Sequence, residues 1–492
     1  MSTKNVSKQA MTDNDIQNIL AGMVRSLGQV PVDIKGIAES GSSRKYYRVF
    51  TEGTTVIGAY NANVEENEAF FYLTEHFGAK GLPVPKLLAV NESRNCYLQS
   101  DLGDESLFSW IQRDLKDGAY SDATINLLKQ VLEQLVRLQT EGHQGLDYSK
   151  VYPVPCFDKG AVIDDLDYFK YYFVKPHAEI VFNETRLKAE FNRFADFVCQ
   201  ADHNYFMFRD FQSRNIMVCG NQPYFIDYQG GRRGPLQYDV VSLLYQVKAQ
   251  MPQNLRDELL QHYKKTLGAH ADLAALDFDK YYPYFVYLRL LQVLGAYGFR
   301  GLIQKKAHFI ESIPFALKEL KVLNESFTLN EYPELQNVVS QVCKLLEKYT
   351  PHSSLLTPHS SLTVTINSFS FKKGYPDDFS GNGGGFVFDC RALPNPGREP
   401  EFKTKTGRDW EVVEYLEAKP QTHVFLEHVK AIVQQSVDNY LERHFSHLMV
   451  SFGCTGGQHR SVFFAQSIAD WLRKDYPQVN VILNHIEQHI HE

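Results

Sequence analysis

The chain has 492 residues, a formal net charge of -7, 43% hydrophobic residues and 22% charged residues. These values are ordinary for two or three globular domains, and the negative charge excludes bulk attraction to nucleic acid or anionic lipid as the main mode of binding. The seven cysteines form no CxxC pair, which indicates reduced thiols and not a disulfide framework or a zinc site. The sequence shows neither a signal-peptide core nor an apolar run of about 20 residues, so we expect a cytoplasmic protein without a membrane partner.

Residues 31–100 contain four strand-like runs, at 32–40, 45–52, 54–62 and 95–103, and one helical pattern at 66–81 that ends in glycine. From residue 107 onward the apolar spacing is mostly helical. This order predicts an α+β arrangement of two lobes, a small β-rich lobe over about 15–105 and a larger α-rich lobe over about 106–350, with a ligand cleft between them.

The segment FMFRDFQSRNIMVCGNQPYFIDYQ, residues 206–229, holds the main candidate for chemistry. Asp210 is followed five residues later by Asn215, and a strand, a turn and a second strand then lead to Asp227. Phosphoryl transfer from ATP needs an aspartate that accepts the proton of the attacking hydroxyl, and an Asn and an Asp that hold Mg²⁺. A hairpin would bring Asn215 and Asp227 together, which makes the combination more specific than D-x4-N alone.

This segment and the following RRGPLQYDVVSLL resemble the aminoglycoside phosphotransferase and choline kinase superfamily, and most of all its anomeric amino-sugar kinases of peptidoglycan recycling. The resemblance covers about residues 15–330. It implies a protein-kinase-like bilobal fold with ATP and Mg²⁺ as cofactors. By motif it makes Asp210 the catalytic base, Asn215 and Asp227 the metal ligands, and Asp239 an organiser of the loop.

Two positions depart from the superfamily pattern. The histidine usual two residues before the base is Phe208, which we expect to serve as packing. The third-strand lysine that binds phosphates in kinase-like folds is absent from TTVIGAYNANVEEN, so Arg44 or Lys45 is the candidate replacement. The turn in ESGSSRKYYRV is expected to cover the nucleotide phosphates through Ser42, Ser43 and Arg44. An inactive kinase fold is the alternative, and the intact Asp–Asn–Asp set argues against it.

The acceptor is expected at DDLDYFKYYFVK, residues 164–175, where the amino-sugar kinases have an acidic and aromatic helix facing the substrate. The resemblance implies that Asp165 and Asp167 bind sugar hydroxyls, and Arg214 is a further substrate candidate. An equally good interpretation is purely structural: the acidic residues lie at the N-terminus of a helix, and the aromatic residues pack into the core.

The near-repeat PHSSLLTPHSSLTV, residues 351–364, cannot bury a core. It predicts a kinase-like region over 1–350, a linker over 351–361 and a separate α/β domain over 362–492. In that domain, SFGCTGGQHRSV at 451–462 follows a strand-like run and precedes a helical one. A strand, a glycine loop and a helix offer N–H groups and a helix dipole to an anion. Cys454 and Arg460 also have the spacing of a cysteine phosphatase, which would need an acid such as Asp389 or Asp409.

With SFSFKKGYP and FVFDCRALPNPGREPEFKTKTGRDWEVVEYL, this motif resembles the C-terminal domain of the RNase adapter family RapZ over residues 362–484, which favours a phosphate-binding loop over a nucleophile. The family's domain senses glucosamine-6-phosphate and binds small RNA. The resemblance therefore implies a phosphosugar site and self-association into a homo-oligomer, and it makes Cys454 a small buried residue. The implied ligand residues are Asp389, Arg391, Asn395, Thr455, Gly456, Gly457, His459, Arg460 and Ser461.

Two features limit this second resemblance. The chain has no Walker A motif, and residues 361–492 hold 13 Lys and Arg against 16 Asp and Glu. An RNA partner is not favoured, because RNA-binding domains rely on a basic footprint. The tail NHIEQHIHE is expected to be a solvated helix, with metal binding by His485, His489 and His491 as the alternative.

Both resemblances concern amino sugars. They predict an ATP-dependent kinase of N-acetylmuramate or N-acetylglucosamine, acting at the anomeric hydroxyl in cell-wall sugar recycling, fused to a regulatory domain that binds a hexosamine phosphate. The alternatives are a non-catalytic sensing adapter, a kinase–phosphatase that uses Cys454, and a kinase of another acceptor such as an aminoglycoside or an amino alcohol.

Overall fold

The computed structural model describes residues 11–37, 44–349, 362–378, 385–443 and 445–492. The chain divides into two compact units, residues 1–299 with 312–346, and residues 300–311 with 347–492. The expected linker at 351–361 lies outside the described residues. No helix in the described ranges is long and apolar enough to cross a membrane.

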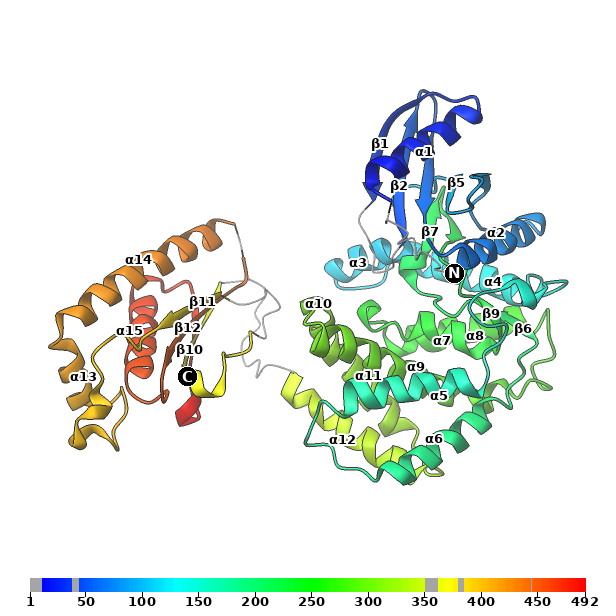
Figure 1. Ribbon diagram of the computed structural model, residues 1–492. Coiled ribbons are helices and arrows are strands. Elements are labelled where there is room, and N and C mark those ends of the chain that lie inside the picture. Colours follow the sequence, from blue (N-terminus) through cyan, green and yellow to red (C-terminus); the bar gives the residue numbers. More distant parts are fainter. Residues whose placement is uncertain (1–10, 38–43, 350–361, 379–384, 444) are drawn as a thin grey trace, which may run out of the picture. The chain divides into compact units, whose positions relative to one another are not determined.

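The first unit begins with a small lobe built on an antiparallel five-stranded sheet of order β1-β2-β3-β5-β4 (Figure 1). Helix α1 packs against this sheet so closely that a Cβ at Gly58 would lie 2.6 Å from Leu20 Cδ1. The predicted strands and helix are confirmed, whereas β4 was not predicted, because its short run LLAV follows two prolines and shows no alternation. The elements are α1 (Asp13–Ser26), β1 (Pro31–Ile37), β2 (Lys45–Thr51), β3 (Thr55–Tyr60), α2 (Val64–Ala79), β4 (Leu87–Val90) and β5 (Cys96–Ser100).

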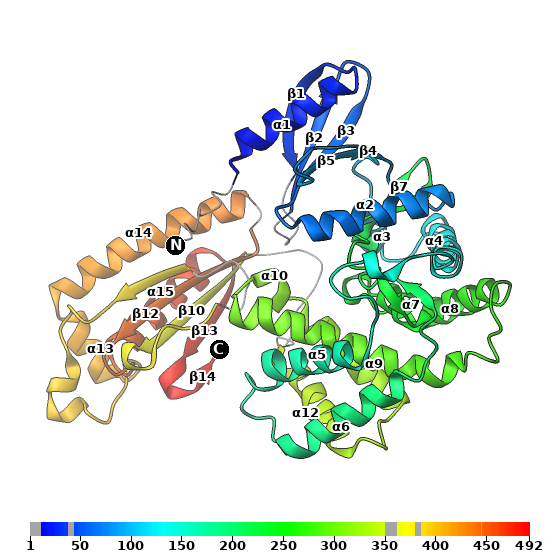
Figure 2. The same ribbon diagram turned by 45° about the vertical axis from the view of Figure 1, so that its right-hand side comes forward.

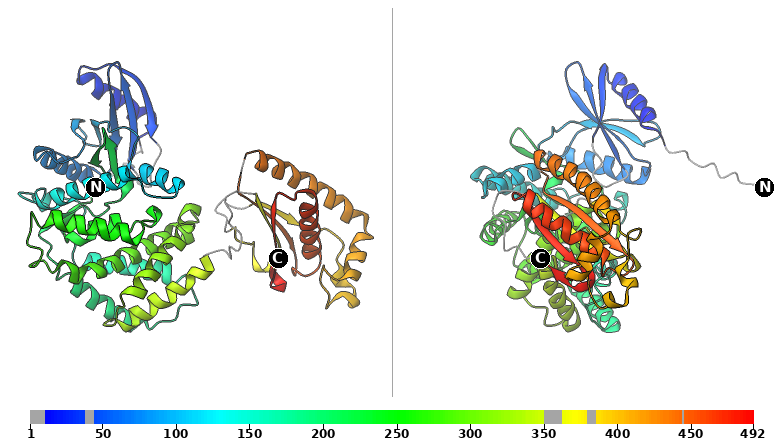
Figure 3. Two further views of the ribbon diagram at one scale, coloured as in Figure 1. Left: turned by 180° about the vertical axis from the view of Figure 1, so that it is seen from behind. Right: turned by 90° about the vertical axis from the view of Figure 1, so that its left-hand side faces the viewer.

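The larger lobe of the first unit is helical, as predicted, and its helices lie on the opposite side of α2 from the small sheet (Figure 3). Two antiparallel strand pairs interrupt the helices: β6 pairs with the distant β9, and β7 forms a hairpin with β8. The helices are α3 (Leu107–Asp117), α4 (Asp122–Thr140), α5 (Lys159–Phe169), α6 (Glu184–Val198), α7 (Leu236–Leu244), α8 (Gln253–Leu267), α9 (Phe278–Tyr297), α11 (Ile313–Ser326) and α12 (Pro333–Tyr349), and the strands are β6 (Tyr205–Met207), β7 (Ile216–Cys219), β8 (Gln222–Phe225) and β9 (Arg232–Gly234).

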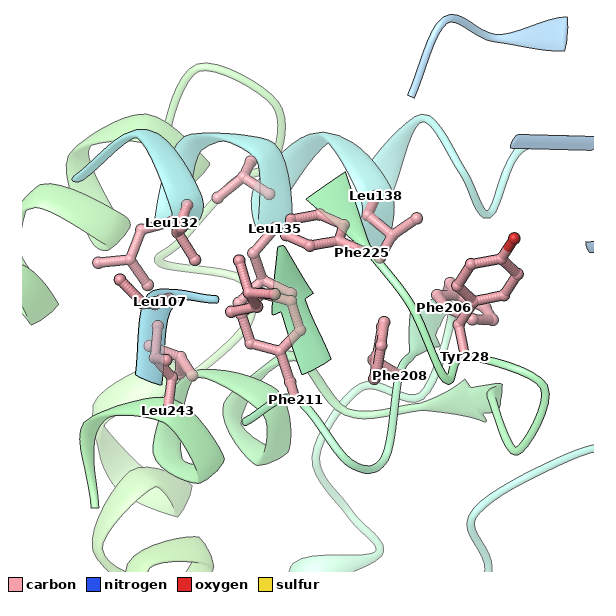
Figure 4. Close-up of a cluster of buried hydrophobic side chains, with 14 of the residues drawn as sticks. Leu107, Leu132, Leu135, Leu138, Phe206, Phe208, Phe211, Phe225, Tyr228 and Leu243 are labelled. Atoms are coloured by element: carbon pink, nitrogen blue, oxygen red, sulfur yellow. The ribbon is translucent and has the colours of Figure 1, made fainter. Parts of the chain in front are cut away.

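An aromatic cluster lies beneath the β7–β8 hairpin, where leucines of α3, α4 and α7 surround it (Figure 4). Phe208 is almost completely buried in this cluster. Its ring meets those of Phe211 and Phe225 edge-on, at centroid distances of 5.3 and 6.3 Å. The expectation that Phe208 packs is confirmed, and the loop that carries Asp210 is thereby anchored in the core.

The second unit contains a sheet of order β11-β12-β10-β13-β14 that is parallel except for β14. Phe388 of β11 and Phe452 of β12 stack on the face where Phe425 of α14 and Phe464 of α15 meet, so both helices cover that face (Figure 2). This is the predicted α/β domain. Its elements are β10 (Thr363–Ser370), β11 (Gly385–Asp389), α13 (Trp410–Glu417), α14 (Pro420–Glu442), β12 (His447–Cys454), α15 (Arg460–Asp475), β13 (Asn480–His485) and β14 (Ile490–His491), and the second unit also includes α10 (Ala307–Ile310).

The predicted helical tail is wrong. Residues 480–485 form β13, which pairs in parallel with β10 from Thr363↔Asn480 to Ser368↔His485. His485 is fully buried, and its Nδ1 lies 3.0 Å from the Ser368 hydroxyl. A partner strand more than a hundred residues away decides this structure, and local spacing could not indicate it.

Candidate functional sites

The catalytic-loop candidate runs from β6 to β7 and is held by Asp239 of α7. The fully buried Asp239 carboxylate accepts the N–H groups of Phe208 at 2.7 Å and Arg209 at 2.9 Å. Burial raises the pKa of Asp239 to about 7, although both N–H donors favour its ionised form. Arg209 has φ 78°, an unfavourable left-handed conformation that persists where surrounding contacts fix it. Asp239 thus occupies the position of a loop organiser.

Asp210 follows this strained residue, and its side chain is 43% exposed. Gln212 Nε2 donates to its Oδ1 at 2.9 Å. Two arginines lie beside the carboxylate: Arg289 Nη2 is 3.4 Å from Oδ1 and Arg214 Nη2 is 3.7 Å from Oδ2. Arg289 belongs to α9 and was not predicted, although a lone arginine in the apolar run FVYLRLLQVL was a signal for a buried ionic partner.

The β7–β8 hairpin brings the two candidate metal ligands close together. Asn215 precedes β7, and its carbonyl accepts the N–H of Ile226 at 3.0 Å, next to Asp227. Asn215 Nδ2 donates to the Asp210 carbonyl at 2.9 Å, which leaves its Oδ1 to face a cation. Asp227 has φ 69° and is exposed. An amide oxygen beside a carboxylate fits Mg²⁺, which prefers oxygen ligands.

The histidines of the C-terminal segment, residues 484–492, do not come together as metal ligands. Across the described ranges, no group of three or more His, Cys, Asp and Glu side chains could hold a metal ion. His485 faces Ser368, and His491 Nδ1 lies 2.9 Å from Asn484 Oδ1.

The structure separates the two candidates for the missing lysine. Arg44 is 4% exposed, and its Nη2 lies 3.0 Å from Glu66 Oε1 of α2. Lys45 points to the outer helix α1, where its Nζ is 2.7 Å from Asp13 Oδ1. Burial raises the pKa of Tyr46, with Arg44 opposing and Asp227 adding to the shift, so Tyr46 has both the guanidinium and the metal-ligand candidate as neighbours. Ser42 and Ser43 lie outside the described residues.

The acceptor candidates are paired within the protein. Arg209 binds Asp165 through two hydrogen bonds, of 2.9 and 2.7 Å, and also donates to the Tyr238 hydroxyl. Asp167 lies 2.7 Å from Lys170 Nζ. These pairs give Asp165 a part in holding the catalytic loop, and the assignment of Asp165 and Asp167 to a substrate stays a prediction. Arg214, a further substrate candidate, is half-exposed and lies beside Asp210.

In the second unit, the glycine loop joins β12 to α15 and forms one wall of a site that we call the cradle, residues 390–398 and 454–461. Gly457 has φ 66°, and a Cβ there would lie 3.0 Å from Ser370 N, so only glycine fits. A cavity of about 500 Å³ lies between the two segments. Its lining residues are Arg391, Ala392, Leu393, Pro394, Asn395, Arg398, Gln421, Thr455 and Arg460.

Four of the predicted ligand residues therefore line the cavity: Arg391, Asn395, Thr455 and Arg460. The others take different positions. His459 Nε2 lies 2.8 Å from the Phe402 carbonyl oxygen, and the Ser461 hydroxyl lies 3.2 Å from Cys454 Sγ. Gly456 and Gly457 shape the loop backbone. Arg398 and Gln421 were not predicted, because nothing in their local sequence marks them.

Arg460 connects the two walls of the cradle. It is 5% exposed, and its Nη1 donates to the carbonyls of Arg391 and Leu393 at 2.8 and 3.0 Å. Its Nε–H has no hydrogen-bond partner among the described residues. With Arg391 and Arg398, it gives the cavity three guanidinium groups, which suits an anion.

Both acids that a phosphatase would need are already hydrogen-bonded within the protein, Asp389 to Arg391 and Asp409 to Thr406. The hydrogen bond from Arg391 lowers the pKa of Asp389, and the N–H of Thr406 lowers the pKa of Asp409. Asp389 is held at 2.9 and 2.6 Å by the Arg391 guanidinium. Neither carboxyl group lines the cavity, whereas three guanidinium groups do, so the geometry favours an anion-binding cradle over a phosphatase.

Comparisons with known proteins cover both units. Residues 33–278 match the model of the phosphotransferase enzyme family, and residues 362–489 match that of the RapZ C-terminal domain. Curated relatives include nucleotide-binding proteins of Albidiferax ferrireducens, 39% identical over 118 residues, and of Methylococcus capsulatus, 39% identical over 126 residues. These matches cover 24% and 26% of this chain, and 38% and 40% of the relatives. The chain thus spans about two fifths of the length of these relatives.

Solved structures similar to this chain include the choline kinase LicA from Streptococcus pneumoniae, with 12% identity and a TM-score of 0.41 over 63% of this chain and 99% of that one. Another is the amicoumacin kinase hAmiN in complex with AMP-PNP, Ca²⁺ and Ami, with 13% identity and a TM-score of 0.42 over 68% and 94%. The family model from residue 33 to residue 278 spans half of the chain, so this chain belongs to the phosphotransferase enzyme family and carries a RapZ C-terminal domain.

Proposed function

We propose that the first unit transfers the γ-phosphoryl group of ATP to the anomeric hydroxyl of an amino sugar, N-acetylmuramate or N-acetylglucosamine. The observation that carries this proposal is the placement of Asp210, Asn215 and Asp227 on one braced loop and hairpin. Membership of the phosphotransferase family supports the reaction type. The fused RapZ C-terminal domain supports an amino sugar as the acceptor.

In this reaction Asp210 accepts the proton of the attacking hydroxyl through its half-exposed carboxylate. Asn215 and Asp227 would hold Mg²⁺, which neutralises charge on the phosphates when it is bound. Asp239 keeps the loop in place, and Arg44 faces the nucleotide phosphates. Positioning supplies most of the catalysis, because such a site has little covalent chemistry to perform.

The test is ³¹P NMR of the full chain with Mg·ATP and a panel of amino sugars, aminoglycosides and amino alcohols. A sugar-1-phosphate resonance is expected. Asp210→Asn should lower kcat by roughly 10² to 10⁴ while ATP still binds, because only proton transfer is lost. Asp196→Asn is the matched control, since that carboxylate lies on the surface beside Lys159.

Two other outcomes would redirect the assignment. Phosphorylation of a non-sugar acceptor would support the proposed phosphotransferase activity and contradict the proposed sugar acceptor. ATP binding without any transfer would favour the sensing adapter, for which the RapZ C-terminal domain is the supporting observation.

We further propose that the cradle binds a hexosamine phosphate, through the three guanidinium groups around its cavity. Calorimetry with glucosamine-6-phosphate should show binding that Arg460→Gln weakens at least about tenfold, since a charged hydrogen bond contributes about 1.5–3 kcal/mol. Arg473→Gln, on the exposed side of α15, is the control. Unchanged affinity in Arg460→Gln would contradict this site.

A further inference from the structure

Two of the seven cysteines lie next to each other in the core, where the two walls of the cradle begin. Strands β11 and β12 pair in parallel with Asp389 opposite Gly453, and the Cys390 N–H donates to the Gly453 carbonyl at 2.8 Å. The next residues along the two strands are Cys390 and Cys454. Residues paired in register project to the same face of a sheet, as the stacked rings of Phe388 and Phe452, two positions earlier, show.

The spacing of these positions suits a disulfide bond. Neighbouring strands lie about 4.8 Å apart, within the Cα separations of roughly 4.4–6.8 Å that disulfides span. Both cysteines belong to the same buried cluster, with Cys390 0% and Cys454 3% exposed. Strand pairing already holds them together, so a bond between them requires little movement of the backbone.

The two thiols differ in reactivity. Burial would raise the pKa of Cys454, but the Ser461 hydroxyl, the N–H groups of Ser461 and Gly457, and the Arg460 charge together hold it below its usual value. Burial raises the pKa of Cys390 well above its usual value, and the neighbouring Cys454 adds to the shift. A thiol whose pKa is lowered, next to one whose pKa is raised, is the arrangement of a reactive cysteine with a resolving cysteine.

We propose that Cys454 and Cys390 form a reversible, peroxide-driven disulfide that closes the cradle. The Cys454 thiolate attacks hydrogen peroxide, the O–O bond breaks, and a sulfenic acid and hydroxide form. Cys390 sulfur then attacks the sulfenic sulfur, its proton leaves with the departing hydroxyl as water, and the S–S bond forms. The two sulfurs lose two electrons and the peroxide gains them. A dithiol reductant reverses the change.

The position of the pair connects the bond to ligand binding, and this part rests on the proposed cradle. Cys390 begins one wall and Cys454 begins the other, and Arg460 links the two through the carbonyls of Arg391 and Leu393. A bond between the sulfurs removes the contact of Cys454 Sγ with the Ser461 hydroxyl, at 3.2 Å. It also removes the Cys454 thiol, whose pKa the Arg460 charge helps to lower, so the loop and the guanidinium lose their reduced-state arrangement.

The experiment treats the full chain with hydrogen peroxide, alkylates the remaining thiols and maps the peptides by mass spectrometry. A peptide pair linked through Cys390 and Cys454 is expected, and it should disappear after dithiothreitol. The oxidised protein should bind glucosamine-6-phosphate at least tenfold more weakly than the reduced protein. Reduction should restore the affinity.

Cys390→Val keeps an apolar side chain in the core and removes the resolving thiol, so peroxide should leave Cys454 as an oxygen acid without a linked peptide. Cys343→Val is the matched control, because Cys343 is also buried, on α12, and burial raises its pKa to about 12. Absence of the linked pair in the wild-type chain would overturn the proposal, and so would a linked protein of unchanged affinity. If the reduced protein does not bind the sugar phosphate, the proposed cradle fails, and the linked peptide alone decides whether the redox pair exists.

Discussion

Among single residues, Arg44 is the proposed replacement for the phosphate-binding lysine of kinase-like folds, because the third strand of this protein contains no lysine. Its guanidinium pairs with Glu66 of α2, as a phosphate-binding lysine pairs with a helix glutamate in protein kinases. Arg44→Met should therefore raise the KM for ATP roughly 10- to 100-fold, the value of one or two charged hydrogen bonds. Lys45→Met should leave it nearly unchanged, since Lys45 binds Asp13 on the outer helix.

Steady-state kinetics with varied ATP checks this prediction, and a melting curve of each variant separates a binding effect from loss of a buried pair. Arg44→Lys serves as the conservative variant, because it keeps the charge and should recover part of the affinity. A larger effect of Lys45→Met than of Arg44→Met would transfer the role to Lys45.

Among the elements, β13 makes the second unit sensitive to acid. Burial, together with Arg408, lowers the pKa of His485 to about 4, while the unfolded chain titrates near its ordinary value of about 6.5. As pH falls, the unfolded state therefore takes up a proton on His485 before the folded state does. The contribution of neutral His485 to the free energy of unfolding is complete above about pH 6.5 and is lost toward pH 4. The loss between pH 7 and pH 5 should be about 2 kcal/mol.

Hydrogen exchange of the β10 and β13 peptides, corrected for intrinsic rates, measures this change in the full chain. His485→Asn, which cannot titrate and keeps a group that can bond to Ser368, should flatten the dependence. An equal slope in the wild type and the variant would assign the acid sensitivity to other groups.

The same elements show which parts could be predicted. The run HLMVSFGC and the helix after it were placed correctly, because an apolar strand, two glycines and an amphipathic pattern are all local signals. The hairpin that joins Asn215 to Asp227 was also local. Arg289 reaches Asp210 from 79 positions further along the chain, and β13 depends on a partner strand as distant as 117 positions. No sequence window contains such contacts.

In the whole molecule, the question is whether the cradle affects the kinase site. Helix α9 carries Arg289 to Asp210, and the chain beyond it, residues 300–311, already belongs to the second unit. The two units are therefore joined through the chain just after the helix that carries Arg289, and this connection is the route we test. We predict that glucosamine-6-phosphate changes the kcat/KM of phosphoryl transfer at least about fivefold, a common size of allosteric coupling.

Initial rates of ADP formation by the full chain, with and without the sugar phosphate, measure this coupling. Arg460→Gln should lose the response, whereas Arg473→Gln should keep it. Coupling of binding is reciprocal, so Mg·ATP should change the affinity for glucosamine-6-phosphate by the same factor as the sugar phosphate changes the affinity for Mg·ATP. Rates and affinities that are both unaffected would mean that the two units act independently. A changed rate with unchanged affinities would place the effect on the catalytic step itself, where Arg289 and Asp210 meet.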